Sequence, residues 1–152
     1  MLSKDTDTIY IEILCHLWHN IEKSIVMKRL ELINKIIERK EQLNITIENL
    51  AKLSNVSVRT VNRVLKNEDV KLSTIEEITN FLGLDFAGNE QISIKELKEK
   101  RAHQKALFLA SLVQGTSALE QQGLDDKSLN NIISMYEKEF LSGNYQNRLW
   151  VA

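Results

Sequence analysis

The stretch that decides the fold spans residues 46–67 and has the sequence TIENLAKLSNVSVRTVNRVLKN. Apolar residues recur at helical spacing over 46–53 and again over 57–66. Thr46 and Ser57 stand at the starts of these two runs, where a side-chain oxygen can cap the free backbone N–H groups of a helix. The stretch therefore predicts two short helices separated by about three residues, which is the geometry of a helix-turn-helix.

The apolar positions of this stretch indicate how the two helices pack. Ala51 is small enough to let the first helix approach the second closely, and Val56 and Val61 are expected to be buried between them. Leu65 is expected to anchor the far end of the second helix. Asn55 suits the turn because asparagine tolerates the left-handed backbone conformation. These constraints leave four side chains on the outer face: Arg59, Thr60, Asn62 and Arg63.

The outer face has the chemistry of a DNA-binding surface. Residues 51–67 contain no acid, although the whole chain has a net charge of -1. A helix fits the major groove, and an arginine can pair bidentately with a guanine edge. The helix starts at Ser57 and Thr46 favour a phosphate, because free N–H groups at a helix N-terminus attract anions. The lysines placed to neutralise backbone phosphates are Lys52, Lys66 and Lys71.

Residues 28–86 resemble a lambda-repressor-like helix-turn-helix domain of the XRE (Cro-like) family. The matching pieces are NLAKLSNVS (49–57), VRTVNRVL (58–65) and LSTIEEITNFLGL (72–84). The sequence VSVRTVNRVL is also similar to LacI-type headpieces. Those headpieces open the chain and precede a large sugar-binding domain, for which 152 residues leave no room.

The XRE resemblance implies a role for each outward side chain. The residues that it places against DNA bases are Ser57, Val58, Arg59, Asn62 and Arg63. It places Thr46, Lys52 and Thr60 nearer to phosphate. The predicted function is a sequence-specific DNA-binding regulator, a repressor, with the helix at 57–66 in the major groove. In a homodimer, two such helices would read half-sites about one helical turn apart.

Hydrophobic periodicity outside this stretch predicts further helices. Residues 9–40 have the pattern of one long helix, or of two helices if Ser24 caps a second start. Ser73 and Glu76 have the spacing of a capping box, which would open a helix that ends at Gly83.

The C-terminal part has the pattern of a helical hairpin, formed by 94–121 and the run after Asp125. The predicted fold class is all-α, a lambda-repressor-like helix-turn-helix bundle with an N-terminal helix and a C-terminal helical hairpin. The predicted divisions are an N-terminal helical extension at 1–27, the DNA-binding domain at 28–90, and a hairpin and tail for dimerisation or partner binding at 91–152.

The sequence of the hairpin and tail does not decide what these segments contact. Small residues at Ala106, Ala110, Gly115 and Ala118 permit close helix contact, either within the hairpin or between two subunits. Trp150 in the tail would dock on a partner or pack back on its own hairpin. The layout is similar to that of small repressors and also to that of antitoxins, whose extension binds a toxin. The alternative function is therefore an antitoxin whose residues 101–152 neutralise a toxin.

Composition argues against several other classes of protein. The chain has 0 Pro, 5 Gly and 1 Cys, which favours helices and excludes an internal disulfide. There is no apolar run of about 18 residues, and the N-terminal sequence MLSKDTDT lacks the pattern of a signal peptide, so the expected location is cytoplasmic.

The sequence contains no recognisable catalytic motif, so we expect neither an enzyme nor a cofactor. Cys15, His16 and His19 offer at most three metal ligands in an amphipathic stretch, so packing is the preferred reading and no metal is predicted. His103 is isolated from any group that could form a catalytic constellation with it.

Overall fold

The computed structural model describes residues 4–119 and 125–151, which form an all-α fold. The elements are α1 (Lys4–Leu43), α2 (Ile47–Leu53), α3 (Val58–Leu65), α4 (Leu72–Leu82), α5 (Ile94–Leu119), α6 (Asp126–Ser142) and the 3-10 helix η1 (Gln146–Arg148). No strand occurs among these residues, and the bridge between Leu84 and Glu90 is isolated. The predicted fold class is confirmed.

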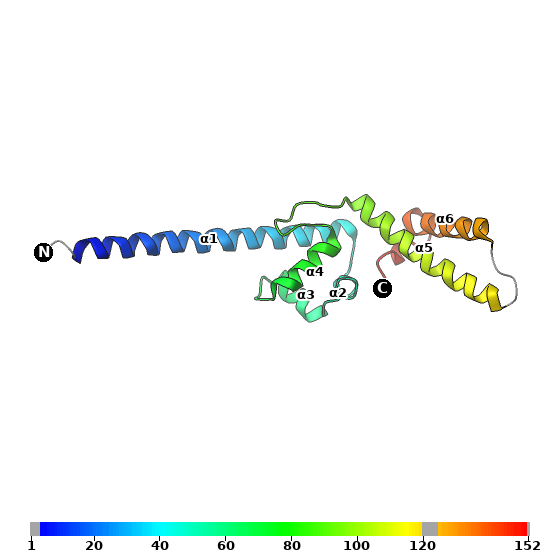
Figure 1. Ribbon diagram of the computed structural model, residues 1–152, viewed down its shortest axis with the longest axis horizontal. Coiled ribbons are helices and arrows are strands. Elements are labelled where there is room, and N and C mark those ends of the chain that lie inside the picture. Colours follow the sequence, from blue (N-terminus) through cyan, green and yellow to red (C-terminus); the bar gives the residue numbers. More distant parts are fainter. Residues whose placement is uncertain (1–3, 120–124, 152) are drawn as a thin grey trace.

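Helix α1 is one continuous helix of 40 residues, which settles the question that the sequence left open at Ser24. Figure 1 shows that only its C-terminal part lies against the bundle of α2, α3 and α4, while its N-terminal part projects away from the rest of the molecule. Within the described part of the chain, no helix combines the length and the apolar character needed to cross a membrane.

The core of the helix-turn-helix bundle is made of apolar side chains from four helices. Its fully buried members are Ile36, Leu43, Leu50, Ala51, Val61, Val64, Ile78 and Leu82. Burying one such Val, Leu or Ile side chain contributes about 1.5–3 kcal/mol, so this core fixes the positions of α2 and α3 on α1. The predicted burial of Ala51 and Val61 is confirmed, while Val56 and Leu65 are partly buried against the same cluster.

Asparagine, rather than glycine, provides the left-handed residue after three successive helices. Asn44, Asn55 and Asn67 follow α1, α2 and α3 with φ angles of 55°, 55° and 58°. Asparagine accepts this backbone conformation more readily than most side chains. The sequence predicted this for Asn55, and the structure shows that it is the common way of ending a helix in this domain.

Helix α4 begins differently from the prediction. Its N-cap is Lys71, which makes no side-chain capping hydrogen bond, and the helix begins at Leu72. The capping box expected from Ser73 and Glu76 is therefore wrong, because Ser73 already lies inside the first turn. The predicted end is confirmed, since Gly83 has a left-handed φ of 68°, and a Cβ there would lie 2.9 Å from the Cβ of Ile92.

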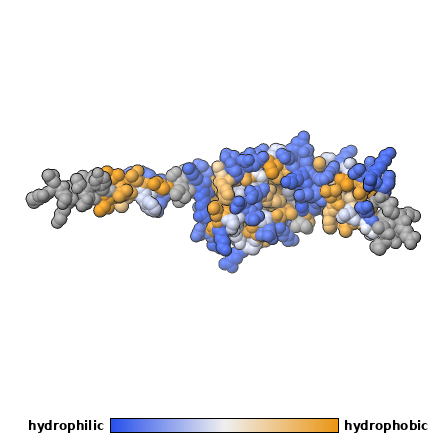
Figure 2. All heavy atoms as spheres, viewed as in Figure 1, coloured by the Kyte–Doolittle hydropathy of each residue, from blue (hydrophilic) through white to orange (hydrophobic). Residues whose placement is uncertain are grey.

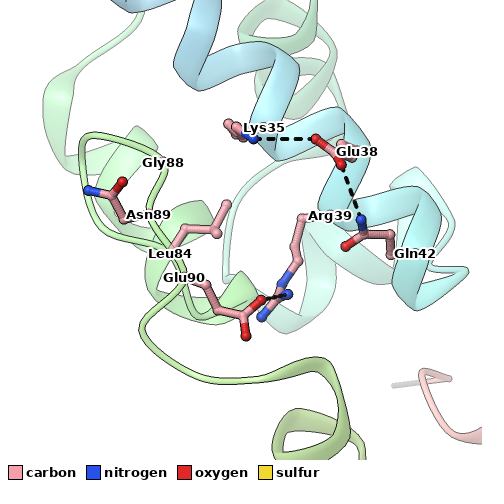
Figure 3. Close-up of a pocket in the computed structure, with 8 residues that line it drawn as sticks. All are labelled: Lys35, Glu38, Arg39, Gln42, Leu84, Gly88, Asn89 and Glu90. Carbon is pink, nitrogen blue, oxygen red and sulfur yellow. Dashed lines mark hydrogen bonds and ion pairs between the residues drawn. The ribbon is translucent and has the colours of Figure 1, made fainter.

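A buried arginine ties the loop after α4 to α1. Arg39 is only 4% exposed, and its Nε donates to the carbonyl of Leu82 at 3.1 Å. Its guanidinium also donates to the Glu90 carboxylate at 2.6 Å and to the carbonyl of Ile92. Figure 3 shows Arg39 reaching from α1 to the carboxylate of Glu90. These bonds compensate the buried charge and hold the start of the connection to α5.

The C-terminal tail returns to the helix-turn-helix bundle. Helices α5 and α6 pack side by side as the predicted hairpin, visible in Figure 1. After η1, Trp150 is 8% exposed and its ring meets Phe81 of α4 edge-on, with centroids 6.1 Å apart. Arg101 of α5 donates to the carbonyls of Leu149 and Val151, each at 3.2 Å. The tail therefore joins the hairpin to the bundle.

Candidate nucleic-acid interface

Helix α3 has one face locked in the core and one face exposed. Val61 and Val64 are buried, and the small Ala51 of α2 lies in the same cluster. The N-cap Ser57 accepts a hydrogen bond from the N–H of Thr60 at 3.1 Å, as the sequence predicted. The helix is therefore fixed in rotation about its own axis, and its other side faces solvent.

The exposed face carries the side chains predicted to contact bases. Val58 is 40% exposed, and Arg59 is exposed with no hydrogen bond or ion pair to the described residues. Asn62 is half-buried, and its amide donates to the carbonyl of Val58 at 3.1 Å. An arginine that is exposed, charged and not engaged by the protein is suited to pairing with a guanine edge.

Arg63 lies one turn further on and is held by an acidic loop. Its Nε donates to the Glu68 carboxylate at 3.3 Å, and its guanidinium donates to the carbonyl of Asp69. Residues 51–67 contain no acid, but the next two acids, Glu68 and Asp69, fold back onto this arginine, which the sequence pattern does not show. Arg63 remains partly exposed while it is oriented by this contact.

Arg29 of α1 is a second arginine that contacts this loop, and it was not among the predicted site residues. It donates to the carbonyl of Glu68 at 2.5 Å, and its guanidinium lies 3.9 Å from the carboxylate of Asp69. Because 39 residues separate it from Glu68, no local pattern could have revealed the contact. Arg29 and Arg63 together fix the loop between α3 and α4 beside the exposed face of α3.

The residues predicted to contact phosphate fall into two groups. Thr46 and Ser57 use their side chains as helix caps, and the hydroxyl of Thr60 lies 2.7 Å from that of Ser57. Lys52, Lys66 and Lys71 are exposed, at the ends of α2 and α3 and at the start of α4. The structure thus places three exposed lysines around the capped starts of α2 and α3.

The residues considered for metal binding lie far from α3. Cys15, His16 and His19 are exposed on the projecting part of α1. Among the residues whose side chains are described, no three His, Cys, Asp or Glu side chains gather as a metal site would require. His103 is paired with Glu137 across the α5–α6 hairpin, with Nδ1 2.5 Å from the carboxylate.

Comparison with known proteins agrees with this geometry. The family model that describes the helix-turn-helix matches residues 36–89, from the second half of α1 to the loop after α4. No curated protein and no solved structure matches the chain. The chain therefore carries a helix-turn-helix domain of the XRE family, which is a family of DNA-binding regulators. In helix-turn-helix domains the second helix of the motif enters the major groove, and α3 holds the second position in the motif of this chain.

Proposed function

We propose that the protein is a sequence-specific repressor that binds double-stranded DNA as a homodimer, with α3 in the major groove. The observation that carries this proposal is the state of Arg59, which is exposed and unengaged on a helix whose opposite face is fixed by Val61 and Val64. Because the guanidinium group is planar and presents its donors in a fixed geometry, Arg59 loses less entropy per hydrogen bond than a lysine would when it pairs with a base.

The roles within the interface follow from the surroundings of each side chain. Arg59 reads a base directly, and Val58 is suited to apolar contact with a thymine methyl group. Ser57 and Thr60 hold the start of α3 in the shape that presents its N–H groups to phosphate. Lys52, Lys66 and Lys71 supply affinity that does not depend on base sequence.

The test compares base reading with phosphate contact. A binding site is first selected from random duplex DNA, and affinity for that site and for random duplex is then measured at several salt concentrations. Arg59→Ala is expected to cost about 1–3 kcal/mol on the selected site and little on random duplex. Lys66→Ala is expected to weaken both equally and to reduce the slope of log affinity against log salt by about one unit.

The matched control is Lys127→Ala, which removes an exposed lysine from α6 in the hairpin. It is expected to leave both affinities and the salt slope unchanged, because exposed charges beyond a Debye length of about 8–10 Å are screened. Equal losses on selected and random duplex for Arg59→Ala would refute the base-reading role.

A second candidate function is that of an antitoxin whose residues 101–152 bind a toxin. It is supported by the exposed apolar side chains of Leu107, Phe108 and Leu112 on α5. If the neighbouring reading frame encodes a growth inhibitor, co-expression of the wild-type protein is expected to restore growth, and Phe108→Glu to abolish the rescue. Rescue by the Phe108→Glu variant would exclude this surface as the toxin-binding site.

A further inference from the structure

The projecting part of α1 carries a continuous apolar stripe that no other described segment covers. Six of its apolar side chains are each more than half exposed: Ile11, Ile13, Leu14, Leu17, Trp18 and Ile21. Figure 2 shows hydrophobic side chains gathered on this projection, away from the bundle. The bundle is already complete without these side chains, so they are not needed to close the core of their own chain.

The stripe has the spacing of a helix-pairing seam. Ile11, Leu14, Trp18 and Ile21 follow one another at intervals of three, four and three residues, which is the a/d pattern of a coiled coil. The polar side chains of the same segment lie elsewhere on the helix. His16 and Asn20 contact each other at 3.1 Å one turn apart, and Glu22 accepts a hydrogen bond from Trp18 Nε1 at the edge of the stripe.

The seam, formed by Ile11, Leu14, Trp18 and Ile21, lies on the same side of α1 as the side chains that pack in the bundle. Leu14 and Trp18 lie 18 residues before the buried Leu32 and Ile36, and 18 residues are about five whole turns of an α-helix. The exposed stripe is therefore the continuation, on an unbroken helix, of the face that α3 and α4 already cover further along.

The area of the stripe matches what a second copy of itself would bury. If each of the six side chains contributes about 100 Å², one copy offers roughly 600 Å² and two copies together roughly 1,200 Å². This total reaches the lower end of the range for stable protein interfaces, about 1,200–2,000 Å². None of the six is charged, so the stripe does not repel its own copy across a two-fold axis.

The position of the bundle determines the direction of pairing. In a parallel pair, the two bundles would lie at the same level, and each would be on the side of its own helix that faces the partner. They would therefore compete for the same space. In an antiparallel pair the bundles lie at opposite ends. A seam of a/d residues then places Leu14 against Trp18 of the second copy, and Ile11 against Ile21.

We propose that residues 11–21 of α1 form the dimer interface of this protein by pairing antiparallel with the same segment of a second copy. This inference rests on the homodimer of the proposed function and names the surface that makes it. The two-fold axis passes close to residue 16, midway between Leu14 and Trp18 of the same chain.

Sedimentation equilibrium of the full chain, without DNA, tests the interface. The wild-type protein is expected to be dimeric, and Leu14→Glu is expected to be monomeric because it buries a carboxylate in the seam. His16→Glu is the matched control, since it adds the same charge within the same turn on the opposite side of the helix. It is expected to remain dimeric. A monomeric wild-type protein, or a dimeric Leu14→Glu variant, would overturn the proposal.

A third variant tests which surface of the second copy the stripe contacts. Phe108 is the most exposed of the large apolar side chains on the hairpin, which is the other apolar surface that residues 11–21 of a second copy could contact. Phe108→Glu is expected to leave the dimer intact. If this variant dissociates the dimer, the stripe packs on the hairpin of the second copy, and the proposed pairing of residues 11–21 with the same segment is wrong.

Spin labels distinguish the two directions of pairing. Cys15 is the chain's only cysteine, so a Cys15→Ser, Lys28→Cys variant carries a single label at the end of the exposed segment. With the axis at residue 16, two labels at position 28 are about 36 Å apart in the antiparallel pair. A distance on the order of 10 Å, the interaxial distance of packed helices, would show parallel pairing and overturn the proposal.

The failures of this inference and of DNA binding are distinguishable. Sedimentation and label distances are measured without DNA, so they succeed or fail independently of α3. A dimer that binds no DNA would refute the proposed function and leave the interface standing. DNA binding by a chain that stays monomeric would refute the interface and the homodimer, and would leave DNA binding by α3 standing.

Discussion

At the scale of single residues, Arg59 and Arg63 differ in their surroundings although they lie one turn apart on α3. Arg59 is unengaged by the described residues, whereas Arg63 is held by Glu68 and Asp69. The pair of Arg63 and Glu68 is exposed to solvent, so it contributes only about 0–1 kcal/mol to stability. Its main effect is on charge, because it places a carboxylate beside a surface that is proposed to approach phosphate.

Glu68→Gln is therefore expected to raise DNA affinity for all sequences while leaving thermal stability nearly unchanged. Removing the carboxylate reduces repulsion from phosphate and releases the Nε of Arg63. Titration with DNA at two salt concentrations, together with a melting curve, measures both effects. The control is Glu99→Gln on α5, which breaks a similar exposed pair with Lys95 and is expected to change neither. Weaker binding by Glu68→Gln would show instead that the pair positions Arg63 for base reading.

Asp85 provides a pH-dependent contribution to stability. Its carboxylate accepts hydrogen bonds from Asn89, from the N–H of Ala87 and from Gln91, and the bonds from Asn89 are the main reason that its pKa is lowered. A lowered pKa in the folded state stabilises the protein above the unfolded pKa, and this stability is lost as pH falls through the folded pKa.

The Asp85→Asn variant is expected to lose stability near neutral pH and to show a smaller further loss than wild type on acidification. Urea unfolding at neutral and acidic pH measures the difference. Asp126, for which no hydrogen-bond partner is found among the described residues and which is exposed, serves as the control position in an Asp126→Asn variant. Parallel pH profiles for wild type and Asp85→Asn would contradict the assignment.

At this scale the sequence predicted groups whose partners are local and missed those whose partners are distant. The caps at Thr46 and Ser57 were predicted correctly because each acts within three residues. The restraint on Arg63 was not predictable in the same way, since Arg29 reaches the acidic loop from another helix.

At the scale of elements, α3 combines a buried face and an exposed face, which is proposed to bind DNA, within eight residues. Two valines on it allow the faces to be tested separately, because Val64 is 1% exposed and Val58 is 40% exposed.

Val64→Ala is expected to lower the free energy of unfolding by about 1–3 kcal/mol, from lost burial and the cavity left behind. Val58→Ala makes the same chemical change on the exposed face and is expected to alter stability by less than about 0.5 kcal/mol. It should instead weaken binding to the selected DNA site. Denaturant unfolding and DNA titration of both variants measure the two effects, and equal destabilisation would contradict the assignment of the two faces.

Element boundaries show where sequence patterns reach their limit. The periodicity of residues 9–40 predicted helix correctly but could not decide between one helix and two, because an internal serine is compatible with both. The start of α4 was misplaced by two residues, because the capping-box spacing of Ser73 and Glu76 also occurs inside a helix whose N-cap is Lys71.

At the scale of the whole molecule, the tail is the link between the hairpin and the bundle. Trp150→Ala is expected to cost about 3–5 kcal/mol in stability, because it removes a large buried ring and its contact with Phe81. Val151→Ala, at the exposed neighbour, is the control and should be nearly neutral. Chemical denaturation measures both, and a small effect of Trp150→Ala would mean that the tail is dispensable for the junction.

The sequence left the destination of Trp150 open between a partner and its own hairpin. The structure shows that the ring also meets α4 of the bundle, a contact across 69 residues that no local pattern reveals. The proposed pairing of residues 11–21 could not be predicted from the sequence either, because an apolar stripe has the same periodicity whether it packs in its own chain or on another molecule.

The unbroken course of α1 has a consequence for the spacing of operators. Ile36, which is fully buried in the bundle, lies 20 residues from the proposed two-fold axis near residue 16, a distance of about 30 Å at the rise of an α-helix. The two helix-turn-helix bundles of the dimer would then be about 60 Å apart. The length of α1 would therefore favour half-sites separated by nearer to two turns of duplex than to one. Deleting whole helical turns from α1 between the two-fold axis and the bundle should shorten the preferred spacing of the half-sites accordingly.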